Sequence, residues 1–292
     1  MSAVAERAWG WLRRNALPIY AGFAVVYMLI PIVVIAVFSF GETPKDKLTF
    51  GLDNGFTLEY WRTAFSLPEL NEAFLTSLRL AALSTAISTA IGTAMAIALV
   101  RHQFFGRRAA NLLIVIPMAT PEIVIGASLL SMFIYYSFAL GFTTLLIAHV
   151  MFSISFVVVV VRSRLIGFDR HLEEAAADLG ATPLATFRTV TLPLLAPGIV
   201  AAALLAFALS IDDFVISNFN SGTTVTFPLY VFGVALRGIP VQVNALATLL
   251  FAVSVVAVAL VLWQQRRAER MAAVRPEPEG AVVPAPGAAT TA

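Results

Sequence analysis

Residues 174–180 read EAAADLG and residues 190–193 read VTLP, and this stretch organises the rest of the chain. It is a charged, soluble-looking segment between very apolar runs. Asp169 can cap the start of a short helix, because its side-chain oxygen can accept a free backbone N–H. Gly180 supplies the left-handed residue that favours a helix end. The stretch therefore predicts a short helix followed by a sharp bend.

A second helix is expected directly after the bend. Thr182 and Pro183 fit its N-cap and first residue. In the first helix, side chains at helical spacing from Leu172 to Leu179 would face inward, whereas Arg188 in the second would face outward. An ordinary amphipathic loop between two membrane helices is the alternative interpretation.

The composition is that of an integral membrane protein. Hydrophobic residues make up 59% of the chain and charged residues 12%, and the mean hydropathy is +0.87. A soluble domain carries about 25% charged residues. Cysteine is absent, which excludes disulfides, thiolate metal sites and a cysteine nucleophile.

Six apolar runs approach or exceed the roughly 20 residues that cross a bilayer. The first is longer than the core of a secretory signal peptide, so we expect it to be retained as a span. Pro117 and Pro121 predict a kink or break in the third run. A further run at 225–236 is too short to span. The six runs lie near 17–40, 71–100, 110–135, 142–161, 196–217 and 244–263.

The basic residues predict the orientation, because cytoplasmic flanks carry an excess of Lys and Arg. With the N-terminus inside, the outer segments hold four, Lys45, Lys47, Arg62 and Arg237, and Arg79 lies within the second run. The inner segments hold fourteen: Arg7, Arg13, Arg14, Arg101, Arg107, Arg108, Arg162, Arg164, Arg170, Arg188, Arg266, Arg267, Arg270 and Arg275. Both termini and the 174–180 stretch are therefore predicted to be cytoplasmic.

We expect three regions along the chain. Residues 1–15 form a cytoplasmic N-terminal segment, and residues 16–263 form a six-span transmembrane domain that contains the loop 162–195. Residues 264–292 form a cytoplasmic tail rich in Ala, Pro, Gly and Glu, which predicts disorder.

The sequence offers little for catalysis, so we expect no enzyme. The two lysines do not follow a glycine, which excludes a phosphate-binding G-x-x-x-x-G-K-[ST] loop. The histidines lack the spacing of a zinc-binding helix, and His149 is interpreted as a hydrogen-bonded packing residue. No metal or cofactor is expected on this chain. If ATP drives its activity, another chain binds the ATP and Mg²⁺.

Three carboxylates lie inside apolar runs: Glu122, Asp212 and Asp213. A charge near the membrane centre costs roughly 2.5–3.5 kcal/mol on insertion scales, so it usually faces a bundle interior or a watery path. A pathway for a cationic solute is one interpretation. Pairing with Arg79 or capping of broken helix ends is the other. Adjacent helical residues point about 100° apart, so we expect Asp212 and Asp213 to have different roles.

The spacing around the organising stretch resembles the signature loop of permease subunits of binding-protein-dependent ABC importers. The loop reads Glu-Ala-Ala, three residues, Gly, nine residues, Val, one residue, Leu-Pro, with Val190 where the family usually has Ile. The resemblance covers about residues 70–263 and implies that this loop is the coupling helix that docks on the ATPase. Its positions here are Glu174, Ala175, Ala176, Gly180, Leu192 and Pro193.

The resemblance also implies an all-α membrane protein with six transmembrane helices, the type I importer permease fold, and coupling helices between helices 4 and 5. It implies a location in the cytoplasmic (inner) membrane. The implied partners are a sister permease, two copies of an ATPase subunit, an extracytoplasmic solute-binding protein and membrane lipid, with no nucleic acid.

Within the family, the chain is similar to the second permease subunit of spermidine/putrescine importers. This similarity lies in residues 210–217 (SIDDFVIS), 227–230 (FPLY), 243–248 (VNALAT) and 121–124 (PEIV). It predicts polyamine import. Importers of iron, thiamine or phosphonates share much of the scaffold and stay as alternatives. An ATP-independent channel or secondary transporter is the alternative from another class.

Overall fold

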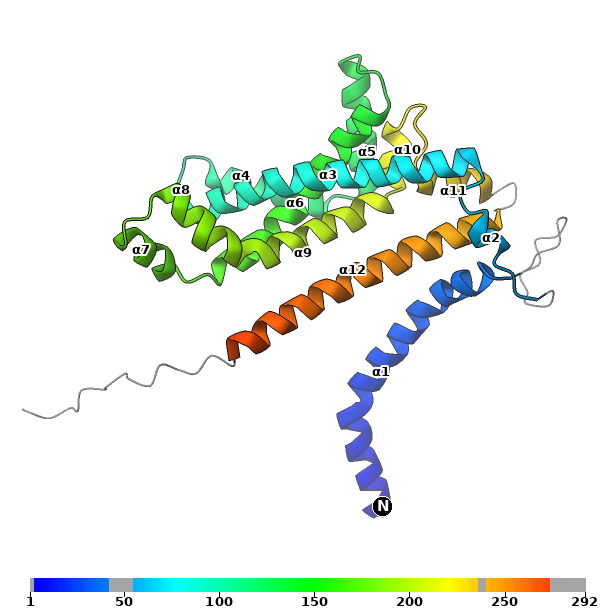
Figure 1. Ribbon diagram of the computed structural model, residues 1–292, viewed down its shortest axis with the longest axis horizontal. Coiled ribbons are helices and arrows are strands. Elements are labelled where there is room, and N and C mark those ends of the chain that lie inside the picture. The colour runs from blue at the N-terminus through cyan, green and yellow to red at the C-terminus, as the bar shows by residue number, and fades with distance from the viewer. Residues whose placement is uncertain (1–2, 42–54, 236–239, 274–292) are drawn as a thin grey trace, which may run out of the picture. The chain divides into compact units, whose positions relative to one another are not determined.

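The computed structural model describes residues 3–41, 55–235 and 240–273, and these residues are helical apart from short connections (Figure 1). No strand occurs among them, although Gly41 and Phe56 form an isolated antiparallel bridge. The chain forms two units, residues 1–252 and 253–292. In the second unit, the described part is the end of the last helix, α12 (Val241–Ala273).

The first helix, α1 (Ala3–Phe38), is apolar from Asn15 onward and mostly exposed there, as a helix that faces lipid would be. It is followed by the short helix α2 (Glu59–Arg62). The Trp61 indole N–H donates to Ser39 Oγ at 3.2 Å, and the Trp61 ring stacks on Phe40 with centroids 5.3 Å apart. These contacts fasten α2 to the end of α1.

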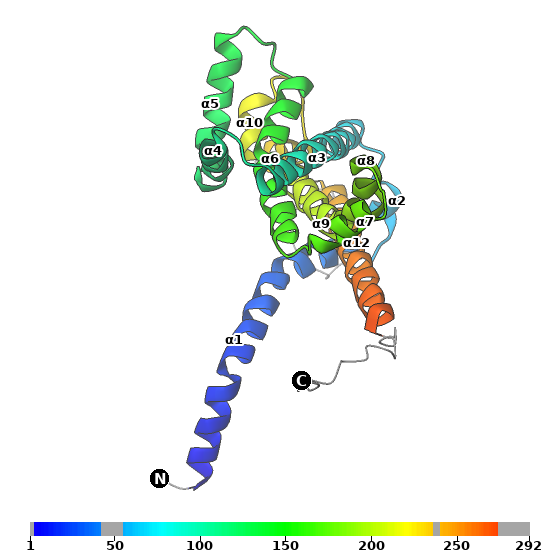
Figure 2. The same cartoon turned by 90° about the vertical axis from the view of Figure 1, so that its left-hand side faces the viewer.

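The core is built by α3 (Pro68–Arg101), α6 (Phe142–Ile166) and α9 (Leu192–Ile211), which lie side by side in Figures 1 and 2. One hydrophobic cluster joins all three, with Leu99, Val157 and Ala202 among its buried members. Small residues at helical spacing on α3 allow this close packing. The buried members of that stripe are Ala81, Ser84, Ser88, Gly92 and Ala96.

The break predicted in the third apolar run is present. Helices α4 (Arg107–Ala119) and α5 (Glu122–Tyr135) meet at a bend of 111°. Pro117 lies inside α4, which continues past it, so the break falls at Pro121. At the end of α4, the Ile116 carbonyl accepts both the Thr120 N–H at 3.0 Å and the Thr120 hydroxyl at 2.7 Å.

The predicted fifth span, near 196–217, is wrong at both ends. Its helix begins earlier, with α8 (Pro183–Thr186) and a π-helix η1 (Phe187–Thr191) that continue into α9, and it ends at Ile211. Residues 215–217 belong to a separate short helix, α10 (Val215–Asn220). Apolar residues lie on both sides of Asp212 and Asp213, so hydropathy averaged over a whole span does not reveal this break.

The remaining helices are α7 (His171–Asp178) and α11 (Phe227–Ala235). The Phe227 N–H donates to Ser77 Oγ at 2.8 Å, which fastens α11 to α3. Within the described residues, five helices are long and apolar enough to span a membrane, or six if the bent α4–α5 pair is one span. The helix α12 covers residues 264–273 of the predicted tail, and residues 274–292 lie outside the described residues.

The contact between α3 and α6 at Gly92 should tolerate no side chain. A Cβ there would lie 2.6 Å from Val157 Cγ1, whereas a Cβ on Gly233 in α11 would meet nothing within 4 Å. We expect Gly92→Ala to destabilise the protein by about 1–3 kcal/mol, the usual cost of overpacking. Thermal unfolding in detergent should show a lower Tm for Gly92→Ala and little change for Gly233→Ala. Equal Tm values would contradict the close packing of α3 on α6.

Candidate functional site

The segment after α6 forms the helix, bend and second helix that its sequence predicts. The Asp169 carboxylate accepts the His171 N–H at 3.0 Å at the start of α7. Gly180 ends the turn with a φ of +83°, in the left-handed region that favours glycine. The Ala181 N–H then donates to the Ala176 carbonyl at 3.0 Å, which closes the helix end.

The second helix also begins as predicted. Thr182 Oγ1 accepts the Ala185 N–H at 3.3 Å, and Pro183 is the first helical residue. Leu192 and Pro193 lie farther along, as the first two residues of α9, and both are exposed. The predicted loop positions are thus divided between α7, the bend and the start of α9.

The inward orientation predicted for the apolar side chains of α7 is wrong. No residue of α7 is buried, and the exposed fractions are 48% for Leu172 and 89% for Leu179. Leu184 on α8 is also exposed. Leu172, Leu179 and Leu184 are thus exposed apolar side chains along the segment that contains α7 and α8.

The two adjacent glutamates of α7 differ in environment. Glu174 and Ala175 are exposed, and Ala176 is partly buried. The Glu174 side chain is 64% exposed and its Oε2 lies 3.2 Å from Nδ1 of His171, which is also exposed. Glu173, which the sequence analysis missed, instead contacts Arg101 of α3 at 2.9 Å.

The second group of candidate residues lies at the break between α9 and α10. Asp213 is buried, and its carboxylate accepts the N–H groups of Ile216 at 3.2 Å and Ser217 at 2.8 Å. It therefore caps the start of α10. Asp212, the residue directly after α9, is exposed. The two aspartates thus occupy different environments.

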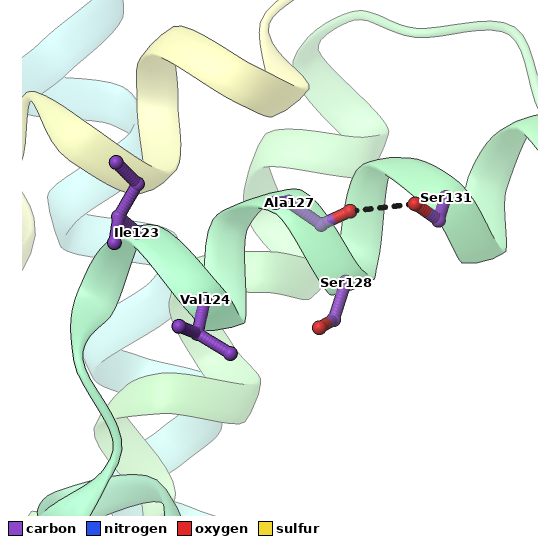
Figure 3. Close-up of a pocket in the computed structure, with 5 residues that line it drawn as sticks. All are labelled: Ile123, Val124, Ala127, Ser128 and Ser131. Carbon is purple, nitrogen blue, oxygen red and sulfur yellow. Dashed lines mark hydrogen bonds between the residues drawn. The ribbon is translucent and has the colours of Figure 1, made fainter.

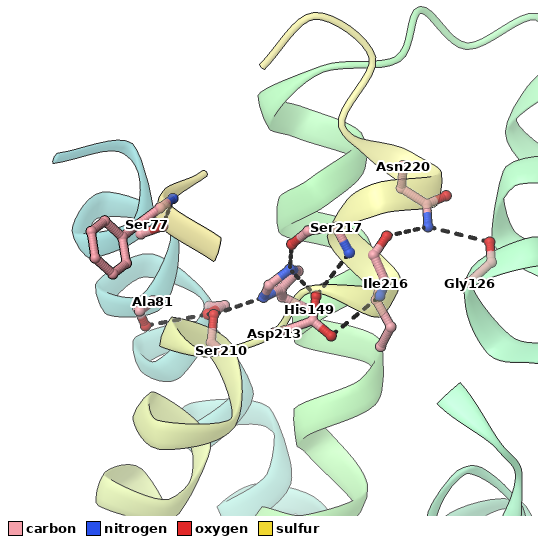
Figure 4. A network of polar contacts seen from close by, with 11 residues as sticks. Ser77, Ala81, Gly126, His149, Ser210, Asp213, Ile216, Ser217 and Asn220 are labelled. Carbon is pink, nitrogen blue, oxygen red and sulfur yellow. Dashed lines mark hydrogen bonds and ion pairs between the residues drawn. The ribbon is translucent and has the colours of Figure 1, made fainter. Parts of the chain in front are cut away.

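A histidine holds this break in place. His149, buried on α6, lies with Nδ1 2.7 Å from Ser210 Oγ and Nε2 3.1 Å from Ser217 Oγ (Figure 4). Its Nε2 is also 3.4 Å from Asp213 Oδ2. Ser84 of α3 donates to Ser210 Oγ at 3.0 Å and extends the network to a fourth helix. His149 is the hydrogen-bonded packing residue that the sequence analysis expected, but its partners were not foreseen.

Glu122 lies at the other break, as the first residue of α5, and is exposed. It is within electrostatic range of both aspartates. The Asn220 side-chain amide donates to the Gly126 carbonyl at 3.3 Å and joins α10 to α5 (Figure 4). The fold therefore brings together the three carboxylates that the sequence analysis singled out, and Arg79 is exposed on α3.

Beyond Glu122, one face of α5 carries a shallow open pocket (Figure 3). Ser131 donates to the Ala127 carbonyl at 2.9 Å within the helix, so this hydroxyl is already partnered. The pocket is lined by Ile123, Val124, Ala127, Ser128 and Ser131. Among the described residues, no group of three His, Asp or Glu side chains could hold a metal ion.

Comparison with known families decides the class of protein. Residues 88–270 match the model of the binding-protein-dependent transport system inner membrane component. The chain belongs to this family. Its relatives are transport permease subunits of ABC importers, and this multi-pass membrane permease is likewise a transport subunit and not an enzyme.

Two curated permeases resemble this one along most of its length. The spermidine/putrescine transport system permease protein PotC of Haemophilus influenzae is 38% identical over 236 residues, which cover 80% of this chain and 90% of that protein. The putrescine transport system permease protein PotI of Escherichia coli is 36% identical over 237 residues, which cover 78% of this chain and 82% of that protein.

A solved structure of a bacterial ABC transporter that imports the acidic polysaccharide alginate has the same fold. It matches with a TM-score of 0.61 and 16% identity, and it covers 90% of this permease and 99% of that chain. Together with the all-helical architecture, this match shows the type I importer permease fold.

The different environments of the two aspartates lead to a stability prediction. We expect Asp213→Ala to lower the stability of the permease by about 0.5–2 kcal/mol or more, because α10 loses its cap and His149 loses a partner. Asp212→Ala should have little effect, because Asp212 is exposed. The measurement is the Tm of each purified variant in detergent. A larger loss for Asp212→Ala would contradict the capping role of Asp213.

Proposed function

We propose that this permease imports polyamines such as spermidine or putrescine. The similarity to permeases named for these solutes, over most of both chains, is the observation that carries the proposal. The transporter would contain a sister permease, two copies of an ATPase subunit that bind ATP and Mg²⁺, and an extracytoplasmic solute-binding protein. This chain and its sister would form the solute pathway.

The carboxylates at the two helix breaks support a cationic solute. Alkyl amines have pKa values near that of lysine, about 10.4, so polyamines carry several positive charges at neutral pH. Glu122 and Asp212 are exposed on this subunit, whereas the Asp213 carboxylate already contacts the Ser217 N–H of α10 and the His149 ring. We therefore assign solute contact to Glu122 and Asp212, and a positioning role to Asp213.

The exposed surface of α7 and α8 supports the coupling role. An ATPase subunit would dock against the apolar side chains of Leu172, Leu179 and Leu184 and against Glu174 beside them. Gly180 forms the bend between the two short helices, so it determines the orientation of α7 relative to α8. Movement of the ATPase subunits would then pass through α8 and η1 into α9.

Uptake of a radiolabelled polyamine tests the proposed function. In vesicles that contain the whole transporter, spermidine uptake should require both ATP and the solute-binding protein. Asp212→Asn keeps the shape of the side chain and removes its charge, so we expect uptake to fall about tenfold, equivalent to about 1.4 kcal/mol. Glu122→Gln should act in the same direction.

The control for these variants is the yield of purified transporter, which should stay at the wild-type level because both side chains are exposed. Uptake at the wild-type rate by both Asp212→Asn and Glu122→Gln would contradict the assignment of solute contact to these two carboxylates. ATP-dependent uptake of a different solute, with none of spermidine or putrescine, would assign the permease to another branch of the family. Uptake that needs no ATP would favour a channel or secondary transporter.

We further propose that both termini and the α7–α8 segment are cytoplasmic. The fourteen basic residues of the inner segments against four of the outer ones support this orientation. A reporter that is active only in the cytoplasm should be active when fused after Arg270 and inactive when fused at Gly222. Activity at Gly222 would overturn the orientation.

A further inference from the structure

Glu173 lies one residue before the Glu-Ala-Ala stretch, and a single oxygen of its carboxylate joins three elements. Arg101, the last residue of α3, donates from Nη2 to Glu173 Oε1 at 2.9 Å. Thr191, the last residue of η1, donates from Oγ1 to the same oxygen at 2.6 Å. Because α9 begins at the next residue, Glu173 connects α7 to the ends of both α3 and α9.

These contacts are sheltered from water. The side chains of Arg101 and Glu173 are 12% and 23% exposed, and Thr191 is buried. The Arg101 guanidinium also lies over the Phe168 ring, 5.1 Å from its centroid. Hydrogen bonds to ionised groups are shorter and stronger than neutral ones, and partial burial reduces their screening by salt.

The neighbouring Glu174 makes no comparable connection. It contacts His171 on the same helix, and both side chains are largely exposed. An exposed pair of this kind contributes little to stability. Glu173 therefore points back to its own subunit, whereas Glu174 lies on the exposed surface of α7.

The rest of α7 is weakly held, because none of its residues is buried. Thr191 lies at the end of a π-turn, where the Leu192 N–H donates to the Phe187 carbonyl. Turns of this kind are rare inside α-helices and occur frequently at functional sites. The π-turn, Thr191 and Glu173 together fix how α7 meets the helix that begins with Leu192.

The two helices that Glu173 reaches are those that build the core. α3 and α9 share one buried cluster with α6. α9 is 20 residues long, about 30 Å at 1.5 Å per residue, and it ends beside Asp212. A displacement of α7 that is transmitted to Thr191 would therefore act on a helix that runs from the coupling segment to the carboxylate cluster.

We propose that Glu173 is the positioning residue that transmits movement of α7 to α3 and α9. The proposal rests on the proposed function, in which α7 docks on an ATPase subunit. Glu173 and Glu174 then have different roles. Glu174 faces the partner, and Glu173 fastens the docked helix to the helices that open the pathway.

The test compares transport with ATP hydrolysis in the complete reconstituted transporter. Thr191→Val replaces the hydroxyl with a methyl group of similar size, and Glu173→Ala removes both bonds. We expect the spermidine taken up per ATP hydrolysed to fall about fivefold or more, the lower end of typical coupling effects. The yield of transporter should stay unchanged. Glu173→Gln keeps an acceptor oxygen and should have an intermediate effect.

Thr189→Val is the matched control, because Thr189 lies in the same π-helix and its hydroxyl donates only to the Ala185 carbonyl, at 2.8 Å. It should retain the wild-type ratio of uptake to hydrolysis. A purely structural role for Glu173 would lower the yield, or lower uptake and hydrolysis together, and would leave the ratio unchanged. That result would overturn the proposal while the proposed function stands.

A second measurement does not depend on the solute. Because this chain has no cysteine, spin labels can be placed at Arg170, before α7, and at Val200 in α9. The measured quantity is the distance between the two labels. Binding of a non-hydrolysable ATP analogue to the transporter should leave this distance unchanged in the wild type, because α7 and α9 move together. In Glu173→Ala the distance should shift or its distribution should widen. An identical response in both would overturn the proposal, and a wild type with no ATP-driven transport would instead overturn the proposed function.

Discussion

Every backbone N–H and C=O group within a bilayer needs a partner in the protein, because the hydrocarbon offers none. Continuous helices meet this requirement within themselves, but this permease breaks its helices at Pro121 and at Asp212. At the second break Asp213 covers two freed N–H groups of α10. At the first, the Thr120 hydroxyl adds a second hydrogen bond to the Ile116 carbonyl, which also accepts the Thr120 N–H.

The same requirement explains why the carboxylates gather where they do. A buried carboxylate is costly unless it is hydrogen-bonded, and Asp213 meets two backbone donors and the His149 ring. Asp213 thus has its partners within the protein, whereas Asp212, directly after α9, is exposed. The helix break therefore leaves one carboxylate that caps α10 and one that is exposed.

The two ends of α9 follow a common pattern. At its start, Thr191 contacts Glu173, and just before its end, Ser210 contacts His149. At both ends a polar side chain of a neighbouring element fixes a residue at a point where regular α-helical geometry stops. Between these points α9 packs by small and apolar residues such as Leu195, Ala202 and Ala206. Polar contacts thus set the ends of a helix whose middle is held by close packing.

The sequence by itself determined the features that depend on composition or on a few neighbouring residues. Hydropathy placed most of the apolar helices, Pro121 predicted the break between α4 and α5, and Gly180 with Thr182 predicted the bend after α7. These signals are local, because a cap or a turn is completed by hydrogen bonds to residues three to five positions away. The spacing of the Glu-Ala-Ala loop was sufficient to indicate the family that the comparisons then showed.

Only the tertiary structure decided which member of each acidic pair contacts other helices of the chain. Asp212 and Asp213 are adjacent and chemically identical, and so are Glu173 and Glu174. Their roles differ because Asp213 and Glu173 reach partners such as His149 and Arg101, the latter 72 residues away along the chain. The end of the fifth apolar run was also missed, because apolar residues continue on both sides of Asp212 and Asp213. Which residues meet across a bundle depends on how whole helices pack, and no short-range pattern encodes that.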